Sequence, residues 1–522
     1  MVNTAVAIRE QEWRVTARHY SVQSAWIARD DWRLDAPTYT GEVYEALRVL
    51  AACRYGTAPL KRLIGGIRHP TEDQARSNFK RIWAKSGIPF LTGRQLFFFR
   101  PDREKHLSTR MPKLHELRVS PGSILLSRSG TVGHPVLVGK WLAQFAVTDD
   151  ALRITPGRAP AGYVYAFLAS RLARALILRG EYGKTVGHLE ASHLLDLPVP
   201  ELPTREQVAI HEEIVRAYAL RDAANDLLDE ADQELHDLVG VSPFTEDDIE
   251  YLGGENDPRA FAVRATVLGD RLDATHYMPI ARSVVHKLQG GRFALVRLGE
   301  RVARVYVAPR FARIYVEEAF GTPLLQGSQL PLIRPYGLKY ISTTKTPRLE
   351  RWIIHSGWVL VTCSGTIGRV AVSTRMQDEW AASQHILRII PKENVTHPGF
   401  LAAFLATPFG QHQLNAQVYG GVVDELTEED TRLVSIPDVP YESQVACGEK
   451  VMKAYGMRDL ANLIEDDAVW MLERLVSEDR GGRSFADIWD ANVARRRLEE
   501  LDRNPRRLVS GPELETRLKG MR

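Results

Sequence analysis

Cysteine is scarce in this sequence, and the usual motifs of metal sites are missing. The 522 residues include only three cysteines, Cys53, Cys363 and Cys447, which are too few and too scattered for a disulfide framework or a zinc site with paired ligands. No His-Glu-x-x-His motif occurs, and the 15 histidines do not recur as a ligand set. We therefore expect reduced cysteines that pack in the core, and no metal site.

Long apolar runs are also absent. No window approaches the roughly 18 uninterrupted apolar residues of a membrane span, and the first 15 residues lack the apolar run of a signal peptide. Hydrophobic residues make up 44% of the chain and charged residues 25%, which is ordinary for a globular protein and enough for several domains. These features predict a cytoplasmic protein that makes no membrane contact.

Catalytic motifs are missing too. The Asn-Pro-Pro-aromatic and Asp-Pro-Pro-Tyr boxes that serve methyl transfer to amino groups do not occur in the sequence. We therefore expect no catalytic residue in this chain. A nuclease-type defence enzyme with an unrecognised active site remains an alternative, as does a two-domain scaffold for protein interactions.

What the sequence does contain is a duplication of about 235 residues. The segment AYALRDAAN at 217–225 returns as AYGMRDLAN at 454–462, an offset of 237 positions. Further pairs follow in the same order, at offsets between 232 and 239: 33–39 with 271–277, 89–96 with 323–330, and 129–133 with 364–368. Chance does not produce such an ordered set, so the chain is predicted to hold two homologous units.

Each unit is predicted to end in a long helix. Over residues 207–238, apolar side chains recur at spacings that average 3.5 residues, the period of a coiled-coil seam, and every one has an apolar counterpart 237 positions later. We expect two helices, about 48 Å long, that pack on each other; the alternative is that each packs on its own globular unit. The partner and coiled-coil positions are Ile210, Ile214, Leu220, Leu227, Leu235, Val451, Met457, Ile464 and Leu472.

Short strands, glycine turns and amphipathic helices within each unit predict a mixed α/β (α+β) fold. The expected parts are two globular units at 1–201 and 242–438, two long helices at 202–241 and 439–476, and a basic tail at 477–522. The tail is either a docking segment or a solvated appendage.

Positive charge concentrates in the same part of both units. Residues 61–118 hold 14 basic against 5 acidic residues, and residues 297–351 hold 10 against 4. The first long helix is acidic instead, with 3 basic against 10 acidic residues over 202–240. Basic patches of this kind predict a nucleic-acid surface, because neutralising phosphates releases counterions. A solvated basic face with no ligand is the alternative.

Side chains suited to DNA contact lie in or near these basic segments. Arg can pair with guanine and Gln with adenine through two hydrogen bonds. The units diverge most between the repeated motifs, around 100–113 and 334–345, where we expect base readout. The residues that we expect to face DNA are Lys80, Arg81, Arg94, Gln95, Arg313, Ser328, Gln329 and Lys345. The repeated pairs Arg81/Arg313 and Gln95/Gln329 could instead hold the fold or phosphates, since readers of different sequences should not share base-reading residues.

The repeated Ser-Gly-Thr-x-Gly turns are a second candidate for DNA contact. Their hydroxyl groups belong to Ser129, Thr131, Ser364 and Thr366. The glycines are predicted to supply a positive φ or a close backbone approach. A scaffold role is favoured over phosphate contact for these turns.

The doubled motifs resemble those of one known family. RLDAPTY with RLDATHY, PFLTGRQL with PLLQGSQL, and ILLSRSGTVG with VLVTCSGTIG precede the long helices, and together they resemble the specificity subunit of type I restriction–modification systems over residues 30–476. The resemblance implies two target recognition domains that each read half of a split double-stranded DNA sequence. It also implies that the two long helices form an antiparallel coiled coil.

The same resemblance implies partners. DNA methyltransferase subunits, two of them, would grip the helices, and a motor-nuclease restriction subunit would join them. S-adenosylmethionine would be bound by the partner methyltransferase, and this chain would hold no cofactor. In phage defence, the role of such a chain would be to recognise DNA.

A rigid strut between two readers predicts a fixed distance between half-sites. The target should therefore be bipartite, with an unread spacer of roughly one helical turn of DNA. Four residues inserted after Ala224, with a matching insertion in the second copy, add about 6 Å of helix. This change is expected to lengthen the spacer by about one or two base pairs.

Overall fold

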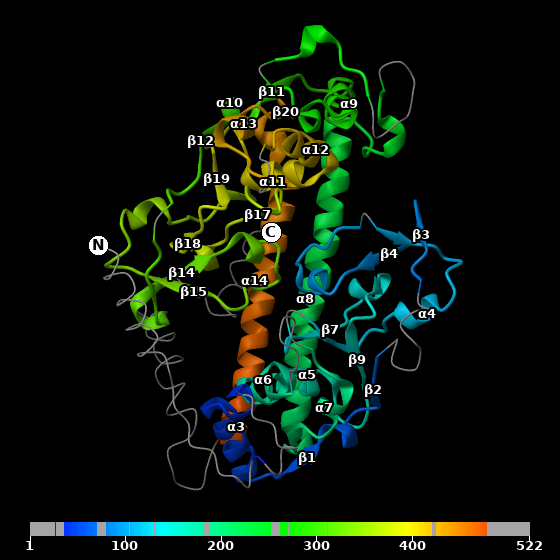
Figure 1. Cartoon of the computed structure of the whole chain (residues 1–522), viewed down its shortest axis with the longest axis vertical. Coiled ribbons are helices and arrows are strands. Elements are labelled where there is room, and N and C mark those ends of the chain that lie inside the picture. Colours follow the sequence, from blue (N-terminus) through cyan, green and yellow to red (C-terminus); the bar gives the residue numbers. More distant parts are fainter. Residues whose placement is uncertain are drawn as a thin grey trace.

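The computed structural model describes residues 27, 36–69, 80–103, 105–129, 132–180, 188–251, 261–269, 271–310, 312–419 and 424–477. Thr131, nearly all of 1–35 and the tail beyond Ser477 lie outside the described residues, and so does Gly130 of the first Ser-Gly-Thr-x-Gly turn. The predicted mixed α+β class is confirmed, since helices and several small sheets alternate along the chain (Figure 1).

The first unit consists of short strands and short helices. Its strands are β1 (Thr57–Pro59), β2 (Gly66–Arg68), β3 (Trp83–Ala84), β4 (Ile88–Leu91), β5 (His106–Leu107), β6 (Ile124–Ser127), β7 (Pro135–Leu137), β8 (Ala146–Val147), β9 (Ala151–Thr155) and β10 (Pro198–Pro200). Its helices are α3 (Gly41–Ala52), α4 (Leu114–Leu117), α5 (Ala161–Ala169), α6 (Arg171–Arg179) and α7 (Ala191–Leu195). Short 3-10 turns lie between them at η1 (Ala36–Tyr39), η2 (Leu60–Arg62), η4 (Arg94–Phe97) and η5 (Leu142–Gln144).

The second unit repeats this order. Its strands are β11 (Leu295–Arg297), β12 (Val302–Tyr306), β13 (Tyr315–Val316), β14 (Gly321–Leu325), β15 (Lys339–Ser342), β16 (Val359–Thr362), β17 (Val370–Val372), β18 (Ala381–Ala382), β19 (Ile386–Pro391) and β20 (Ser435–Pro437). Its helices are α9 (Pro279–Gln289), α10 (Leu298–Arg301), α11 (Pro398–Ala406), α12 (Pro408–Ala416) and α13 (Glu428–Arg432). The 3-10 turns are η6 (Glu246–Asp248), η7 (Ala265–Val267), η8 (Ala274–Tyr277), η9 (Glu318–Phe320), η10 (Gly327–Gln329), η11 (Leu349–Arg351) and η12 (Arg375–Gln377).

The strand order of the sheets is the same in both units. In the first unit the sheets run β2-β9-β6-β7, β3-β5-β4-β8 and β1-β10, and in the second β12-β19-β16-β17, β13-β15-β14-β18 and β11-β20. Each four-stranded sheet of one unit thus has a counterpart made of equivalent strands in the other. The repeat of about 235 residues is therefore a repeat of topology as well as of sequence.

A buried arginine joins the two four-stranded sheets within each unit. Arg153 and Arg388 are equivalent residues, 235 positions apart, with exposed fractions of 5% and 0%. Both guanidinium groups donate only to backbone carbonyls, for example from Arg153 Nη1 to Ala151 O at 2.7 Å and from Arg388 Nη1 to Ile386 O at 2.6 Å. Burial lowers the pKa of each to about 10. The repeated Leu-Arg-Ile motif therefore serves the fold and not a ligand.

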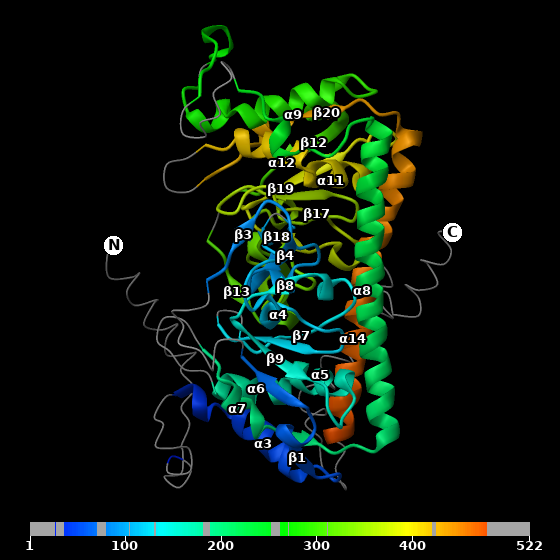
Figure 2. The ribbon, with the colours of Figure 1, turned by 90° about the vertical axis from the view of Figure 1, so that its right-hand side faces the viewer.

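The two long helices are α8 (Thr204–Val239) and α14 (Tyr441–Ser477). They run antiparallel, side by side, along one edge of the molecule, with both units on the same side of the pair (Figures 1 and 2). Residue contacts agree with this direction, since Ala231 of α8 meets Cys447 near the start of α14 and Arg221 meets Glu465 further along it. Gly240 ends α8 in the left-handed conformation, with φ of 78°.

The apolar seam of these helices packs partly on the units and partly between the helices. Ile210 and Ile214 lie in the core of the first unit together with Leu472, and Leu235 lies in the core of the second with Val451. Between these cores, Leu220 and Ile464 share one small cluster, and Leu227 and Met457 share another. Each helix therefore contributes to both units, which combines the two arrangements that the sequence left open.

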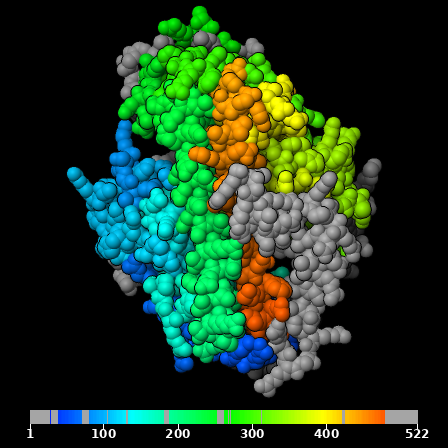
Figure 3. Space-filling view, turned by 180° about the vertical axis from the view of Figure 1, so that it is seen from behind, coloured from blue at the N-terminus to red at the C-terminus, as the bar shows by residue number. Residues whose placement is uncertain are grey.

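The opposite side of the helix pair is a surface of the molecule. Seen from behind, α8 runs down the middle of that face with α14 beside it (Figure 3). Exposed acidic residues follow α8: Glu212, Asp226, Glu230, Asp232 and Asp237. Within the described residues no single helix is long and apolar enough to cross a membrane; α5 and α6 reach that threshold only jointly, and a 71° bend separates them.

Candidate nucleic-acid interface

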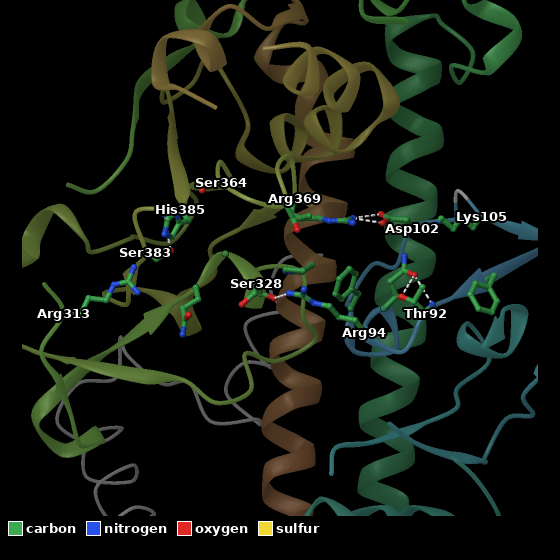
Figure 4. Close-up of a pocket in the computed structure, with 17 residues that line it drawn as sticks. Thr92, Arg94, Asp102, Lys105, Arg313, Ser328, Ser364, Arg369, Ser383 and His385 are labelled. Carbon is green, nitrogen blue, oxygen red and sulfur yellow. Dashed lines mark hydrogen bonds and ion pairs between the residues drawn. The ribbon is translucent and has the colours of Figure 1, made fainter. Parts of the chain in front are cut away.

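A cavity of about 550 Å³ lies where the two units meet, in front of α8 and α14 (Figure 4). Both units contribute to its wall. Four of the residues expected to face DNA line it, Arg94, Gln95, Arg313 and Ser328. Ser364 and Thr366, from the turn for which a scaffold role was favoured, line it as well. Lys105 and Arg369 add two further cations, while Asp102 is the single carboxylate among the described residues that line it. The cavity thus brings the basic segments of both units to one place.

Arg94 belongs to the first unit and reaches toward the second. It opens η4, and its Nη2 donates a hydrogen bond to the backbone oxygen of Ser328 at 3.2 Å. Ser328 is the equivalent residue of the repeat, 234 positions later. Since a guanidinium has five N–H groups, this one bond leaves most of the donors of Arg94 for a ligand such as a phosphate.

Arg313 approaches the cavity from the second unit. Its Nη2 donates to Gln384 Oε1 at 2.5 Å, and Gln384 Nε2 lies 3.0 Å from His385 Nε2. Burial, with the nearby charges of Arg313 and Arg310, lowers the pKa of His385. His385 is therefore neutral at pH 7, and the positive charge of this wall comes from arginine.

The equivalent arginine of the first unit has a different environment. Arg81 forms an ion pair with Asp149 and lies over the ring of Phe90, 5.1 Å from its centroid. Asp149 neutralises its charge, which favours the fold-holding role for Arg81 over DNA contact. Arg313, in contrast, meets the neutral Gln384. Equivalent positions therefore carry different electrostatics in the two units.

Gln95 and Gln329 hold the turns in which they lie. Gln95 Oε1 accepts from the backbone N–H and the hydroxyl of Thr92, at 3.0 and 2.9 Å. Gln329 is only 7% exposed; its Oε1 accepts from the N–H of Gln326 and its Nε2 donates to Tyr336 O, at 2.9 and 2.8 Å. These bonds stabilise η10 and the chain that follows it, which favours the alternative that Gln329 holds the fold.

The hydroxyls of the glycine turns divide into two kinds. Ser129 Oγ donates to Asp150 Oδ1 at 2.9 Å and lies 2.8 Å from His188 Nδ1, so it serves as scaffold. Ser364 and Thr366 line the cavity instead. The predicted positive φ occurs at Gly133, Gly365 and Gly368, with values of 86°, 76° and 84°.

Lys80 and Lys345 lie apart from this cavity. Both are exposed, and neither is among its lining residues. Lys345 follows β15, where its backbone N–H donates to Ser342 Oγ at 3.1 Å. The structure thus brings together Arg94 and Arg313 of the predicted set, whereas Arg81, Lys80 and Lys345 are not among the residues that line the cavity.

Two arginines at the starts of the divergent segments have a structural role that the sequence reasoning missed. Arg100 donates to Asn225 O at 3.1 Å and pairs with Asp229 at 2.5 Å, both on α8. Arg334 does the same on α14, with Asn462 O at 3.1 Å and Asp466 at 2.7 Å. These contacts favour a structural role over base readout at these two positions. The repeated Arg-Pro pair, at 100–101 and 334–335, was the signal that could have revealed them.

No group of three or more His, Cys, Asp or Glu residues suited to a metal ion occurs in the part of the chain that the structure describes. The three cysteines are free and buried. Burial raises the pKa of both Cys363 and Cys447 to about 12, so neither thiol is a nucleophile near pH 7.

Comparisons with known proteins point to one family. Residues 325–455 match the family model of the type I restriction modification DNA specificity domain. No curated protein matches the chain. One similar solved structure is the S subunit of a type I restriction-modification system from M. genitalium, with 12% identity, coverage of 82% of this chain and 96% of that chain, and a TM-score of 0.35.

Two more solved structures are similar over most of the chain. The HsdS subunit from Thermoanaerobacter tengcongensis shares 13% identity, with 82% of this chain and 97% of that chain covered and a TM-score of 0.27. A chain from a structure on complex assembly and conformational transition of the type I R-M system shares 12% identity, with coverage of 80% and 97% and a TM-score of 0.26. The match over residues 325–455 confirms the resemblance found in the sequence: this part of the chain is similar to the type I restriction modification DNA specificity domain.

Proposed function

We propose that this chain binds a bipartite double-stranded DNA target and directs partner subunits to it. The observation that carries the proposal is the duplicated fold, in which two units of equal strand order share one antiparallel helix pair and meet at one basic cavity. Each unit acts as a target recognition domain, and α8 with α14 forms the coiled coil between them. Two equivalent recognition domains held at a fixed distance by the helix pair fit a target with two half-sites and an unread spacer between them.

The cavity supplies contacts to the phosphate backbone. Arg94 and Arg313 enter it from different units, and Lys105 adds a third cation. Phosphate contacts of this kind position a protein on DNA without reading its sequence. They fit the centre of a bipartite target, where the bases of the spacer are not read.

Base readout requires different side chains at equivalent places in the two units. Arg94 and Arg313 contact phosphates in the cavity and do not supply this readout. The exposed Lys80 and Lys345 lie on other surfaces of their units, where they contact the DNA of the half-sites. Two unlike readers would thus recognise two unlike half-sites.

The acidic, exposed side of α8 is left for protein partners. Its carboxylates would repel DNA phosphates, so it fits a protein surface instead. The internal repeat offers equivalent surfaces twice, which suits two DNA methyltransferase subunits. S-adenosylmethionine binds to those subunits, a motor-nuclease restriction subunit joins the complex, and the assembly works in the cytoplasm, where the DNA is.

The test is a genome-wide map of methylated sites with and without this gene. A split motif that disappears on deletion of the gene supports the proposal, whereas an unsplit motif or an unchanged map rejects it. The full chain alone, given duplex DNA and a divalent metal, should cleave nothing, and turnover would favour the nuclease alternative. A scaffold for protein interactions would show no salt-sensitive binding of duplex DNA.

A further inference from the structure

The two units also contact each other directly, through their own backbones. Phe98 of the first unit and Leu332 of the second form an antiparallel β-bridge. Beside it, the N–H of Phe99 donates to Pro331 O and the N–H of Ile333 donates to Phe97 O, both at 2.8 Å. Phe98 and Leu332 are equivalent residues, 234 positions apart. The contact therefore lies on the pseudo-two-fold axis of the repeat.

Two side-chain contacts flank this bridge, and they are counterparts of each other. On one side Arg369 Nη1 of the second unit lies 2.8 and 2.6 Å from the carboxylate oxygens of Asp102 in the first (Figure 4). On the other side His134 of the first unit stacks on Tyr336 of the second, with centroids 4.0 Å apart. His134 is equivalent to Arg369, and Tyr336 to Asp102. An ion pair and a ring stack thus occupy symmetric places.

The bridge is attached to both helices as well. Phe99 and Ile333 lie in one cluster with Ala224 of α8 and Ala454 of α14, both fully buried. The next residues along the chain, Arg100 and Arg334, bind the carboxylates of Asp229 and Asp466 on those helices. We define this set of contacts, from residues 97–102 and 331–336 to the helices and to Arg369 and His134, as the central junction.

We propose that the central junction, and not helix length alone, sets the distance between the two DNA half-sites. Long helices curve gently and are rarely straight, so their length alone does not fix how far apart the two units lie. The junction connects the two units to each other and to both helices near the middle of the molecule. It thereby fixes both the separation of the readers and their rotation about the DNA axis, and so the length of the spacer. This inference rests on the proposed function.

The experiment weakens the junction at its ion pair. Arg369→Gln removes the charge that Asp102 faces, and the charge swap Asp102→Arg with Arg369→Glu restores an ion pair in reversed order. Arg301→Gln is the matched control, because Arg301 pairs with Asp438 inside the second unit. The first readout is a set of duplexes whose spacers differ by one base pair. Each affinity is taken relative to that for the optimal spacer, so any general weakening of phosphate binding in the cavity cancels.

Arg369→Gln should lower the discrimination between the optimal spacer and its neighbours by about tenfold, the worth of a charged pair with two hydrogen bonds. The swap should restore most of it, and the control should keep the wild-type ratio. Unchanged discrimination in Arg369→Gln overturns the proposal. A loss in the control as large as that in Arg369→Gln also overturns it, because any surface ion pair would then have the same effect.

A second readout needs no DNA. Spin labels at Thr109→Cys and Thr343→Cys sit on exposed, equivalent positions of the two units, and the three native cysteines are buried. Arg369→Gln should broaden the distance distribution between the labels, and the swap should narrow it again. An unchanged distribution rejects a mechanical role for the junction. If the distribution broadens but the wild-type chain binds no duplex, the proposed function has failed and the spacing role fails with it.

Discussion

Arg221 of α8 and Glu465 of α14 form an ion pair in which each side chain is only 6% exposed. Tyr165 of the first unit donates to Glu465 at 2.8 Å, and Arg334 of the second lies 3.5 Å from it. Burial alone would raise the pKa of Glu465, but Arg221 and Arg334 outweigh it and lower that pKa. One carboxylate therefore joins both helices and both units.

Loss of this carboxylate should destabilise the whole chain. Glu465→Gln leaves buried arginine charge without its partner, which costs about 3 kcal/mol of unfolding free energy. Glu442→Gln, at an exposed position in the first turn of the same helix, should change it by less than about 0.5 kcal/mol. Urea unfolding of the full chain at pH 7 measures both. Equal effects of the two substitutions would show that the buried pair contributes nothing particular.

As the pH falls, protonation of His134 should lower the free energy of unfolding before the carboxylates are protonated. Burial, then the charges of Arg174 and Arg334, lowers the pKa of His134 from 6.5 to about 3. Between pH 6.5 and 3 the unfolded chain binds a proton at this histidine and the folded chain does not. The contribution of neutral His134 to folding stability is therefore complete above pH 6.5. It is lost as the pH falls from 6.5 toward 3.

His134→Gln tests this pH dependence. Between pH 6.5 and 5 the wild type should lose up to about 2 kcal/mol more unfolding free energy than the variant. Urea titrations at the two pH values give the difference. If the wild type and the variant lose the same stability over this range, a group other than His134 causes the loss.

Arg94 and Arg313 should contribute to DNA binding independently of the DNA sequence. Arg94→Gln and Arg313→Gln each remove a cation from the cavity, so affinity should fall by a similar factor for cognate and unrelated duplexes. The slope of log affinity against log salt should flatten by about 0.9 for each phosphate that the variant no longer neutralises. Arg48→Gln is the control, since Arg48 pairs with Glu45 within α3. A changed preference at one base pair would instead make the arginine a base reader.

The sequence predicts the duplicated parts of this fold well, because local pattern determines them. Seam residues such as Ile214 and Val451 are buried, as their period requires, and the glycine turns have the expected positive φ. The burial of Gln329 was not predictable in the same way. Its side chain binds Tyr336, seven residues on. The repetition of Gln95 as Gln329 hints at a role in the fold, but the sequence does not show which backbone groups the side chain binds.

The central junction lay beyond the reach of sequence for another reason. Phe98 and Leu332 are distant in the chain, and an apolar residue at each place fits an ordinary core equally well. Only the arrangement of both units on one helix pair brings them together. The same holds for the cavity, since Arg94 and Arg313 lie in segments whose separation no motif encodes.

Lengthening the helices distinguishes most sharply whether helix length or the central junction sets the length of the DNA spacer. Two of the polar contacts that hold α8 to the first unit lie close to Ala224: Asp222 accepts from the N–H of Lys140 at 2.7 Å, and Asn225 and Asp229 bind Arg100. Four residues inserted after Ala224 fall between these two contacts. They move Asp229 by about 6 Å and turn it by about 40° relative to Asp222. A matching insertion after Ala461 does the same to Asp466 and Arg334.

The double insertion should therefore release Arg100 and Arg334 and strain the central junction. With the junction otherwise intact, we expect lower stability and weaker binding to the cognate duplex, without a new preferred spacer. In a background that also carries Arg369→Gln and His134→Gln, which remove the side-chain contacts between the units, helix length has more control over the distance, and the preferred spacer should grow by about one or two base pairs. Competition among duplexes of stepped spacer length measures this. A clean shift at full affinity from the insertion alone would mean that helix length suffices, because the junction would then have followed the helices without resisting them.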